Sequence, residues 1–198
     1  MNKESIGSDD SNSQDLRIAE ISKLDEASYE RSLNKSELSK VWEFAKSNDA
    51  HERFRAYRIL EDYIDPKNLG VFIDLARREL HWLPRTALYA TILEVELPAS
   101  MAFLEEQFEA ERNPDGKYIL ASMMRDEGNQ KVLEYCANNK SRRARWIFSR
   151  LEAQYMLGQI TLESYQKALK RMLRNRQNWR FIEPYLESAG LPKPSKWY

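Results

Sequence analysis

The sequence contains very few of the residues that build disulfides, metal sites and nucleophilic centres. Its 198 residues include one cysteine and two histidines, so neither an internal disulfide nor a Cys/His zinc site can form. It also lacks a phosphate-binding glycine-rich loop, a Gly-x-Ser-x-Gly elbow and any carboxylate pair typical of general acid–base catalysis. We therefore expect a protein that is not an enzyme and that holds no cofactor and no metal.

Long apolar segments are also missing. No run approaches the roughly 18 residues that a membrane-spanning helix requires, and the N-terminus lacks the apolar core of a signal peptide. We therefore expect a cytoplasmic protein without membrane contact. Residues 1–14 are rich in Ser, Asn and Asp and predict a disordered tail. Residues 15–189 are expected to form a single helical-repeat domain, and residues 190–198 a C-terminal tail.

The hydrophobic pattern from about residue 15 onward is helical, and no alternating apolar–polar run predicts a strand. Capping residues mark the helix ends: Asn34 and Glu37 have the spacing of a capping box, and Asp65 caps a helix whose first residue is Pro66. We expect helices over residues 16–32, 36–47, 50–64, 66–80, 84–96, 98–111, 114–126, 129–139, 141–157, 161–175 and 178–189.

The predicted helices repeat along the chain. Four of them open at positions that lie 32 residues apart, namely Asp65, Leu97, Asn129 and Thr161. Their partner helices carry a basic residue at the same interval, namely Arg53, Arg85 and Lys117. A pair of antiparallel helices cannot bury its apolar face alone, so we expect the pairs to stack. The sequence therefore predicts an all-α fold of about five helix pairs with a period of about 31 to 32 residues.

Two segments resemble the second helix of the HEAT family of helical repeats. They are Asn48–Leu60, with its Asp-turn, Arg, Ala and Leu pattern, and Pro84–Leu93. The resemblance extends over about residues 34–189 and is architectural. It implies a right-handed α–α superhelix, a HEAT-like solenoid whose curved face binds a partner, and it implies no reaction.

The formal net charge is zero, but the charges are unevenly distributed. Residues 140–198 carry thirteen basic and four acidic side chains, a net charge of +9, whereas residues 1–139 carry eighteen basic and twenty-seven acidic ones, a net charge of −9. The two halves could attract each other within the chain or between two copies, or each could bind a partner. The sequence leaves both alternatives open.

The acidic half predicts a face for a basic protein partner. Its candidate residues are Glu61, Asp62, Glu94, Glu96, Glu105, Glu106 and Glu109. We expect a non-catalytic protein that binds a macromolecular partner and blocks or bridges it. The most concrete form is a bacterial immunity protein or antitoxin whose acidic face covers a basic toxin or nuclease domain.

The basic half supports an alternative function, nucleic-acid binding. Its candidate residues are Arg142, Arg143, Arg145, Arg150, Lys170, Arg171, Arg174, Arg176 and Arg180. Arginines interleaved with Trp146 and Trp179 can pair with phosphates and stack on bases, although both tryptophans also suit core packing. Some HEAT-like proteins are DNA alkylation glycosylases, but no Trp/Asp/Arg motif of theirs is found here; the alternative function is therefore binding of DNA, as in those proteins, or of RNA.

Overall fold

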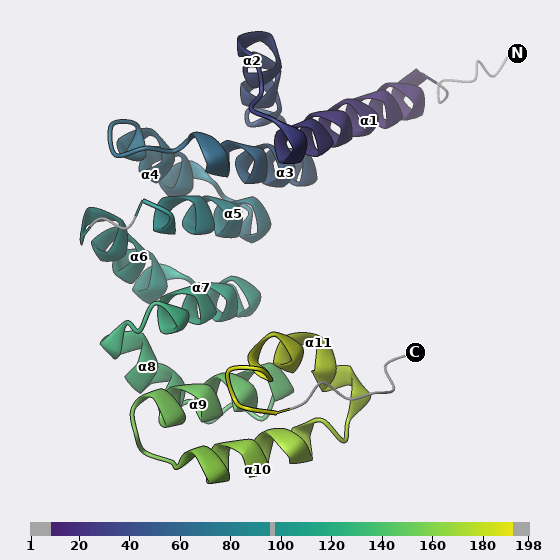
Figure 1. The fold of residues 1–198 in the computed structure, drawn as a ribbon. Coiled ribbons are helices and arrows are strands. Elements are labelled where there is room, and N and C mark those ends of the chain that lie inside the picture. Colours follow the sequence, from purple (N-terminus) through teal and green to yellow (C-terminus); the bar gives the residue numbers. More distant parts are fainter. Residues whose placement is uncertain (1–8, 96–97, 192–198) are drawn as a thin grey trace, which may run out of the picture. The chain divides into compact units, whose positions relative to one another are not determined.

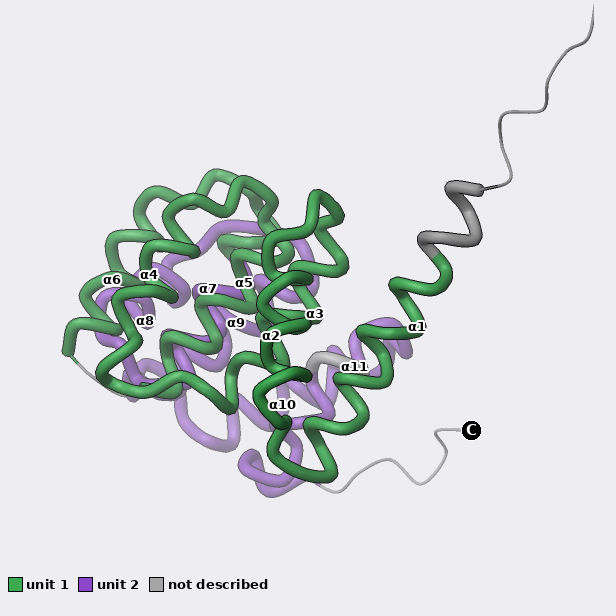
Figure 2. Tube along the Cα trace, turned by 90° about the horizontal axis from the view of Figure 1, so that it is seen from above, with its two compact units in different colours: residues 1–117 green, residues 118–198 purple. Residues whose placement is uncertain are grey.

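A computed structural model describes residues 9–95 and 98–191, without the side chains of residues 9–14, 180 and 181. The chain divides into two compact units, residues 1–117 and 118–198, and we treat each by itself (Figure 2). Every regular element in the described residues is helical, which confirms the all-α prediction. The right-handed superhelix and the single domain over residues 15–189 stay predictions.

Unit 1 is built around two central helices (Figure 1). Its elements are α1 (Asp9–Glu30), α2 (Lys35–Phe44), α3 (Ala50–Leu60), the 3-10 helix η1 (Glu61–Tyr63), α4 (Leu69–Arg78), α5 (Trp82–Leu93) and α6 (Pro98–Ala110). Helix α3 packs against α1, α2 and α5, and α5 packs against α4 and α6 as well. The fully buried side chains of Leu60, Leu88 and Ile92 fill the space between them.

Unit 2 is built around α9. Helix α7 (Pro114–Asp126) begins in unit 1 and ends in unit 2; the other elements of unit 2 are α8 (Gln130–Ala137), α9 (Ala144–Met156), α10 (Leu162–Met172), η2 (Arg176–Asn178), α11 (Trp179–Ile182) and η3 (Glu183–Tyr185). Helix α9 packs against both α8 and α10. Phe148, Tyr165, Leu169, Ile182 and Leu186 form its buried cluster.

The 32-residue interval read from the sequence is found in the helices themselves. Helices α3, α5 and α7 begin at residues 50, 82 and 114, and helices α6, α8 and α10 begin at residues 98, 130 and 162. Equivalent side chains are also buried alike, since Leu60, Ile92 and Met124 are each 0% exposed. The repeat is therefore a repeat of helix starts and of core positions.

One predicted helix cap is confirmed and another is misplaced. The side chain of Asn34 accepts from the backbone N–H of Glu37, and Glu37 accepts from that of Asn34, so the capping box exists. Asp65 caps a turn instead of a helix. Its Oδ1 accepts hydrogen bonds from the backbone N–H groups of Lys67 and Asn68 at 2.8 and 3.0 Å. Helix α4 consequently begins at Leu69, three residues after Pro66.

Two further boundaries differ from the predicted ones. Helix α1 begins at Asp9, so it includes residues 9–14 of the predicted disordered tail. Each residue added to an existing helix gains one hydrogen bond, so extending a helix costs much less free energy than nucleating one, even in a polar segment. The helix predicted over residues 178–189 is replaced by the short segments α11 and η3, because Pro184 lacks the N–H that would continue α11 as an α-helix.

Candidate functional site

Two buried ion pairs occupy equivalent positions of neighbouring repeats in unit 1. Arg53 donates from Nε and Nη2 to Oε2 and Oε1 of Glu79 at 2.7 and 2.9 Å. Arg85, one period later, donates from Nε and Nη2 to Oε2 of Glu111 at 3.1 and 2.7 Å. The two glutamate side chains are only 4% and 2% exposed. Because a buried carboxylate is costly unless it is paired, each pair holds its arginine in one geometry.

The same glutamates shape the turns that precede α5 and α7. Glu79 accepts a hydrogen bond from the backbone N–H of His81 at 2.9 Å, and Glu111 accepts one from that of Asn113 at 2.8 Å. Arg85 adds a bond from Nη1 to the backbone oxygen of Glu79 at 3.1 Å. Each turn is therefore fixed through one buried carboxylate, which gives the surface above it a defined shape.

The ion pair at Glu79 makes the stability of unit 1 depend on pH. Burial acts to raise the pKa of Glu79, but the hydrogen bonds from Arg53 and from the backbone of His81 outweigh it, so the pKa lies below its ordinary value. The stabilisation is therefore fully present above the ordinary carboxyl pKa of about 4.3 and is lost as the pH falls through the lower, folded-state pKa. We expect the stability advantage of the wild type over Glu79→Gln to be constant down to about pH 4.3 and to shrink as the pH falls below it in thermal unfolding; an advantage independent of pH would contradict this.

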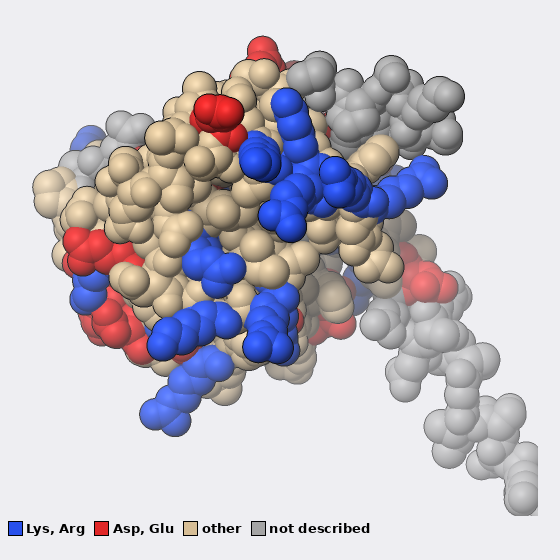
Figure 3. Space-filling view, turned by 90° about the horizontal axis from the view of Figure 1, so that it is seen from below, with Lys and Arg blue, Asp and Glu red and all other residues tan. Residues whose placement is uncertain are grey.

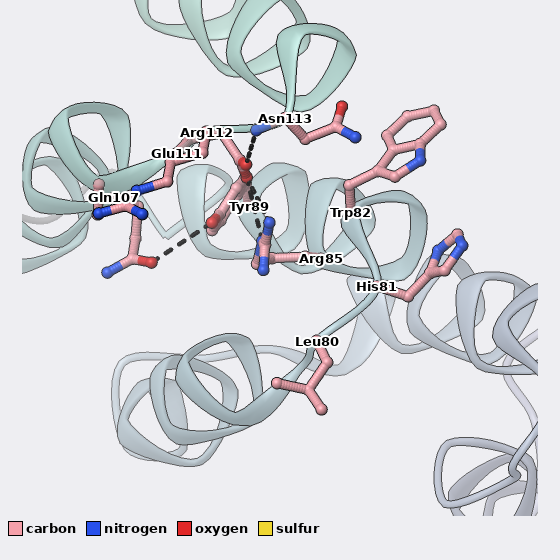
Figure 4. Close-up of a pocket in the computed structure, with 10 residues that line it drawn as sticks. Leu80, His81, Trp82, Arg85, Tyr89, Gln107, Glu111, Arg112 and Asn113 are labelled. Carbon is pink, nitrogen blue, oxygen red and sulfur yellow. Dashed lines mark hydrogen bonds and ion pairs between the residues drawn. The ribbon is translucent and has the colours of Figure 1, made fainter.

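A surface pocket opens beside each ion pair. The pocket at Arg85 has a volume of about 390 Å³ (Figure 4) and is lined by Leu80, His81, Trp82, Arg85, Tyr89, Gln107, Ala110, Glu111, Arg112 and Asn113. The pocket at Arg53 has a volume of about 270 Å³ and is lined by Ser47, Arg53, Tyr57, Leu75, Arg78, Glu79 and Leu80. The arginine, tyrosine and glutamate of one pocket lie 32 residues from those of the other. The repeat has therefore duplicated a pocket, and Leu80 lines both copies.

Leu80 and His81, in the turn between α4 and α5, and Trp82, the first residue of α5, form a ridge at the pocket mouth. Leu80 is 92% exposed, and the rings of His81 and Trp82 stack with their centroids 6.2 Å apart. In Figure 4 Arg85 lies between Leu80 on one side and the turn after α6, with Glu111 to Asn113, on the other, and the side chain of Leu80 points away from that turn. Burial raises the pKa of Tyr89 to about 12, so at neutral pH its hydroxyl is protonated and donates to Gln107 Oε1 at 3.4 Å.

The third basic position of the repeat uses different chemistry. The ammonium group of Lys117 donates to the backbone oxygen of Phe108 and lies 4.1 Å from the centre of its ring. The third repeat therefore replaces the arginine–glutamate ion pair of the first two repeats with a lysine bound to a backbone oxygen, as the change from arginine to lysine indicates.

The predicted acidic face separates into two groups in the structure. Glu61, Asp62 and Glu94 lie together at the C-terminal ends of α3 and α5. Burial raises the pKa of Glu61, the positive charge of Arg58 lowers it, and the negative charges of Glu94 and Asp62 raise it further. The other described candidates, Glu105, Glu106 and Glu109, lie on α6. Glu106 accepts from Arg77 Nη2 at 3.2 Å in an exposed ion pair. Glu96 lies outside the described residues.

The predicted basic face is also divided. The half-buried guanidinium of Arg145 lies 5.1 Å from the ring centre of Tyr118, and Arg150 Nη1 donates to the backbone oxygen of Asn139 at 2.8 Å, so both stabilise the fold. Arg142 and Arg143 are exposed in the turn before α9. Lys170, Arg171 and Arg174 line one surface hollow along α10; Arg176 lies in η2, and the side chain of Arg180 is outside the described residues.

A buried polar cluster in unit 2 has the features of a structural network. The side chain of Arg125 is 0% exposed, and it donates to Asp126 Oδ1 from Nε and Nη2 at 3.0 and 2.7 Å and to the hydroxyl of Tyr185 at 3.1 Å. Burial raises the pKa of Glu152, and the hydrogen bond from Tyr165 and the charge of Arg125 only partly offset it. The side chains of Arg125 and Tyr165 are 0% and 1% exposed, so the cluster lies largely within the core of unit 2.

Sequence reasoning missed the residues that shape these surfaces. The spacing of Arg53 and Arg85 also holds for Glu79 and Glu111, and comparing carboxylates at the same interval would have found the ion pairs. Lys167 lines the hollow of α10 and lies three and four residues before Lys170 and Arg171, a helical spacing visible in the sequence. Nothing in the sequence marks Leu80 as exposed, since an apolar residue at a helix end usually packs inward.

In the described residues, no group of three or more His, Cys, Asp or Glu side chains could hold a metal ion. Each helix in that part of the chain is too short or too polar to cross a membrane. Comparison with protein-family models, with curated proteins and with solved structures finds no match for this chain.

Proposed function

We propose that this chain is a non-catalytic, HEAT-like repeat protein that binds one protein partner through unit 1 and blocks or bridges it. The observation that carries the proposal is the 92% exposed Leu80, which lies between two equivalent pockets on a turn held by a buried ion pair. An isolated exposed leucine needs no explanation. An apolar side chain presented by a fixed turn, with a pocket on each side, is typical of an interface anchor.

The residues around Leu80 have the chemistry of a binding hot spot. Trp82 and Arg85 belong to the residue types that contribute most at protein interfaces, and both line the larger pocket; Tyr89, which is 1% exposed, supports the pocket from within. Because Arg85 and Tyr89 are already held by Glu111 and Gln107, little side-chain entropy is lost when a partner binds. This preorganisation favours one partner of complementary shape.

The charge of unit 1 supports a basic partner. Glu61, Asp62 and Glu94 repel one another, and none of them takes part in an ion pair within the described residues. A cationic protein surface would relieve this repulsion and steer association. An immunity protein or antitoxin that neutralises a toxin is the most concrete form of the proposal. It requires that the captured partner be toxic when expressed alone and harmless when this chain is co-expressed.

Affinity capture with matched variants tests the proposal. We expect wild-type protein to capture one stoichiometric protein from cells that express the chain, and Leu80→Ser to reduce that capture at least about tenfold, because a hot-spot anchor contributes about 2 kcal/mol or more. Val71→Ser on α4 is the control, since Val71 is also an exposed aliphatic residue of unit 1, at 51%. Both substitutions should leave thermal stability unchanged.

Two results would contradict the proposal. Equal capture by wild type, Leu80→Ser and Val71→Ser would show that the ridge makes no contact with the partner. A partner whose binding is unchanged by reversing Glu61, Asp62 and Glu94 to lysine, and by added salt, would remove the basic-partner form.

A further inference from the structure

Helix α10 of unit 2 carries a row of cations along one face. Lys167, Lys170 and Arg171 are spaced by three and four residues, and Arg174 follows just beyond the helix end. These four side chains line a surface hollow of about 590 Å³ together with Glu163 and Gln166. Figure 3, viewed from the side where α10 lies in Figure 1, shows Lys and Arg side chains gathered on that face.

The four cations share the hollow with one carboxylate, Glu163, and differ in their pairing from several arginines of unit 1. In unit 1 Arg17, Arg53, Arg77 and Arg85 each form an ion pair with a glutamate. None of the ion pairs formed among the described residues involves a cation of the hollow. The helix dipole favours positive charge at Lys170 and Arg171 in the last turn of α10, but Lys167 and Arg171 are like charges four residues apart, and such a pair destabilises a helix. The arrangement therefore favours an external polyanion.

The hollow is held in place by the opposite face of the helix. Tyr165 and Leu169 are 1% and 0% exposed in the core of unit 2. Gln166 Nε2 donates to the backbone oxygen of Ala189 at 2.8 Å, which ties the edge of the hollow to the turn that follows η3. The cations thus project from a fixed helix, and binding needs no rearrangement of the backbone.

The aromatic residues near the basic segments are committed to packing. Trp146 is 6% exposed and lies edge-on to Tyr118 and Tyr135, with ring centroids 5.3 and 6.1 Å away. The indole N–H of Trp179 donates to the backbone oxygen of Leu173 at 2.6 Å. No aromatic side chain lines the hollow. Base stacking, which single-strand binding proteins use, therefore has no support here, whereas contact with phosphates does.

We infer that the hollow of α10 binds the phosphate backbone of a nucleic-acid duplex without reading its sequence. Lys167, Lys170 and Arg171 lie on a helix that rises about 1.5 Å per residue, and Arg174 follows two residues after its end, so the row of cations extends over roughly 10 Å. One strand of a duplex presents about three phosphates over about 10 Å of its axis. The four cations supply charge at that interval. This surface belongs to unit 2 and is independent of the protein-binding function proposed for unit 1.

Fluorescence anisotropy with a short labelled DNA duplex tests this inference on the full chain. We expect binding that weakens steeply with salt, with a negative slope of log affinity against log salt of about 3. The triple variant Lys170→Glu, Arg171→Glu, Arg174→Glu should weaken binding at least tenfold and flatten the slope. The matched control Lys35→Glu, Lys46→Glu, Lys67→Glu reverses three exposed lysines of unit 1 and changes the net charge equally, so it should retain most of the affinity.

Several outcomes would overturn the inference. They are the absence of duplex binding at low salt, an equal loss of affinity in the control, and tighter binding to single strands than to the duplex. A loss confined to Arg142→Glu, Arg143→Glu would place the contact in the turn before α9. Binding to phosphatidylserine vesicles or to polyglutamate at least as tight as to the duplex would assign the hollow to a membrane or to an acidic protein instead.

Discussion

Replacing Arg85 by alanine is expected to destabilise unit 1 by about 3–5 kcal/mol, which urea unfolding followed by circular dichroism would measure. The substitution leaves the carboxylate of Glu111, 2% exposed, without its cation. It also removes the bond from Arg85 to the backbone of Glu79, which holds the turn before α5. An uncompensated buried charge is among the few defects with so large an effect.

Two controls separate this buried pair from ordinary surface ion pairs. The double variant Arg85→Ala, Glu111→Leu should recover most of the lost stability, because it leaves no buried charge. Arg77→Ala should cost less than about 1 kcal/mol, since Arg77 and Glu106 are 52% and 59% exposed. A loss below about 1 kcal/mol for Arg85→Ala would show that the pair does not hold the pocket.

Arg125→Ala is expected to cost about 3–5 kcal/mol in unit 2, comparable to removing a large buried aromatic side chain. The guanidinium of Arg125 is fully buried, with its centre 5.6 and 5.5 Å from the ring centres of Phe148 and Tyr185. Its Nη1 has no hydrogen-bond partner among the described residues. Truncation would therefore leave a large void beneath two aromatic rings.

Arg125→Met distinguishes packing from charge as the source of this stability. Methionine fills much of the same space, and it removes an unsatisfied buried donor, so we expect a loss below about 1.5 kcal/mol. Asp126 is 43% exposed and can be solvated after it loses its partner. If methionine were as destabilising as alanine, the ion pair and not the packing would hold this cluster together.

The helices were largely predictable because their signals are local. The capping residues Asn34, Asn129 and Thr161 each accept a backbone hydrogen bond at the predicted helix start. The errors arise where two local rules compete. Asp65 with Pro66 is as typical of a turn as of a helix start, and the structure uses it for a turn.

The candidate sites were less predictable, because their residues are defined by what packs on them. Arg145 and Arg171 are both arginines in a basic segment, yet one stacks on Tyr118 and the other faces a hollow. Glu111 follows directly on the acidic residues of α6 but is buried in an ion pair. Local charge patterns identify a charged segment, whereas the direction of each side chain depends on the repeat next to it.

Site-specific photo-crosslinking from position 80 tests the central proposal most directly. A photoreactive amino acid in place of Leu80 should crosslink to a single protein in cells that express the chain, and the same group in place of Val71 should not. Crosslinks of equal yield from both positions, or none from position 80, would contradict the proposal that the ridge between the two pockets binds a protein partner.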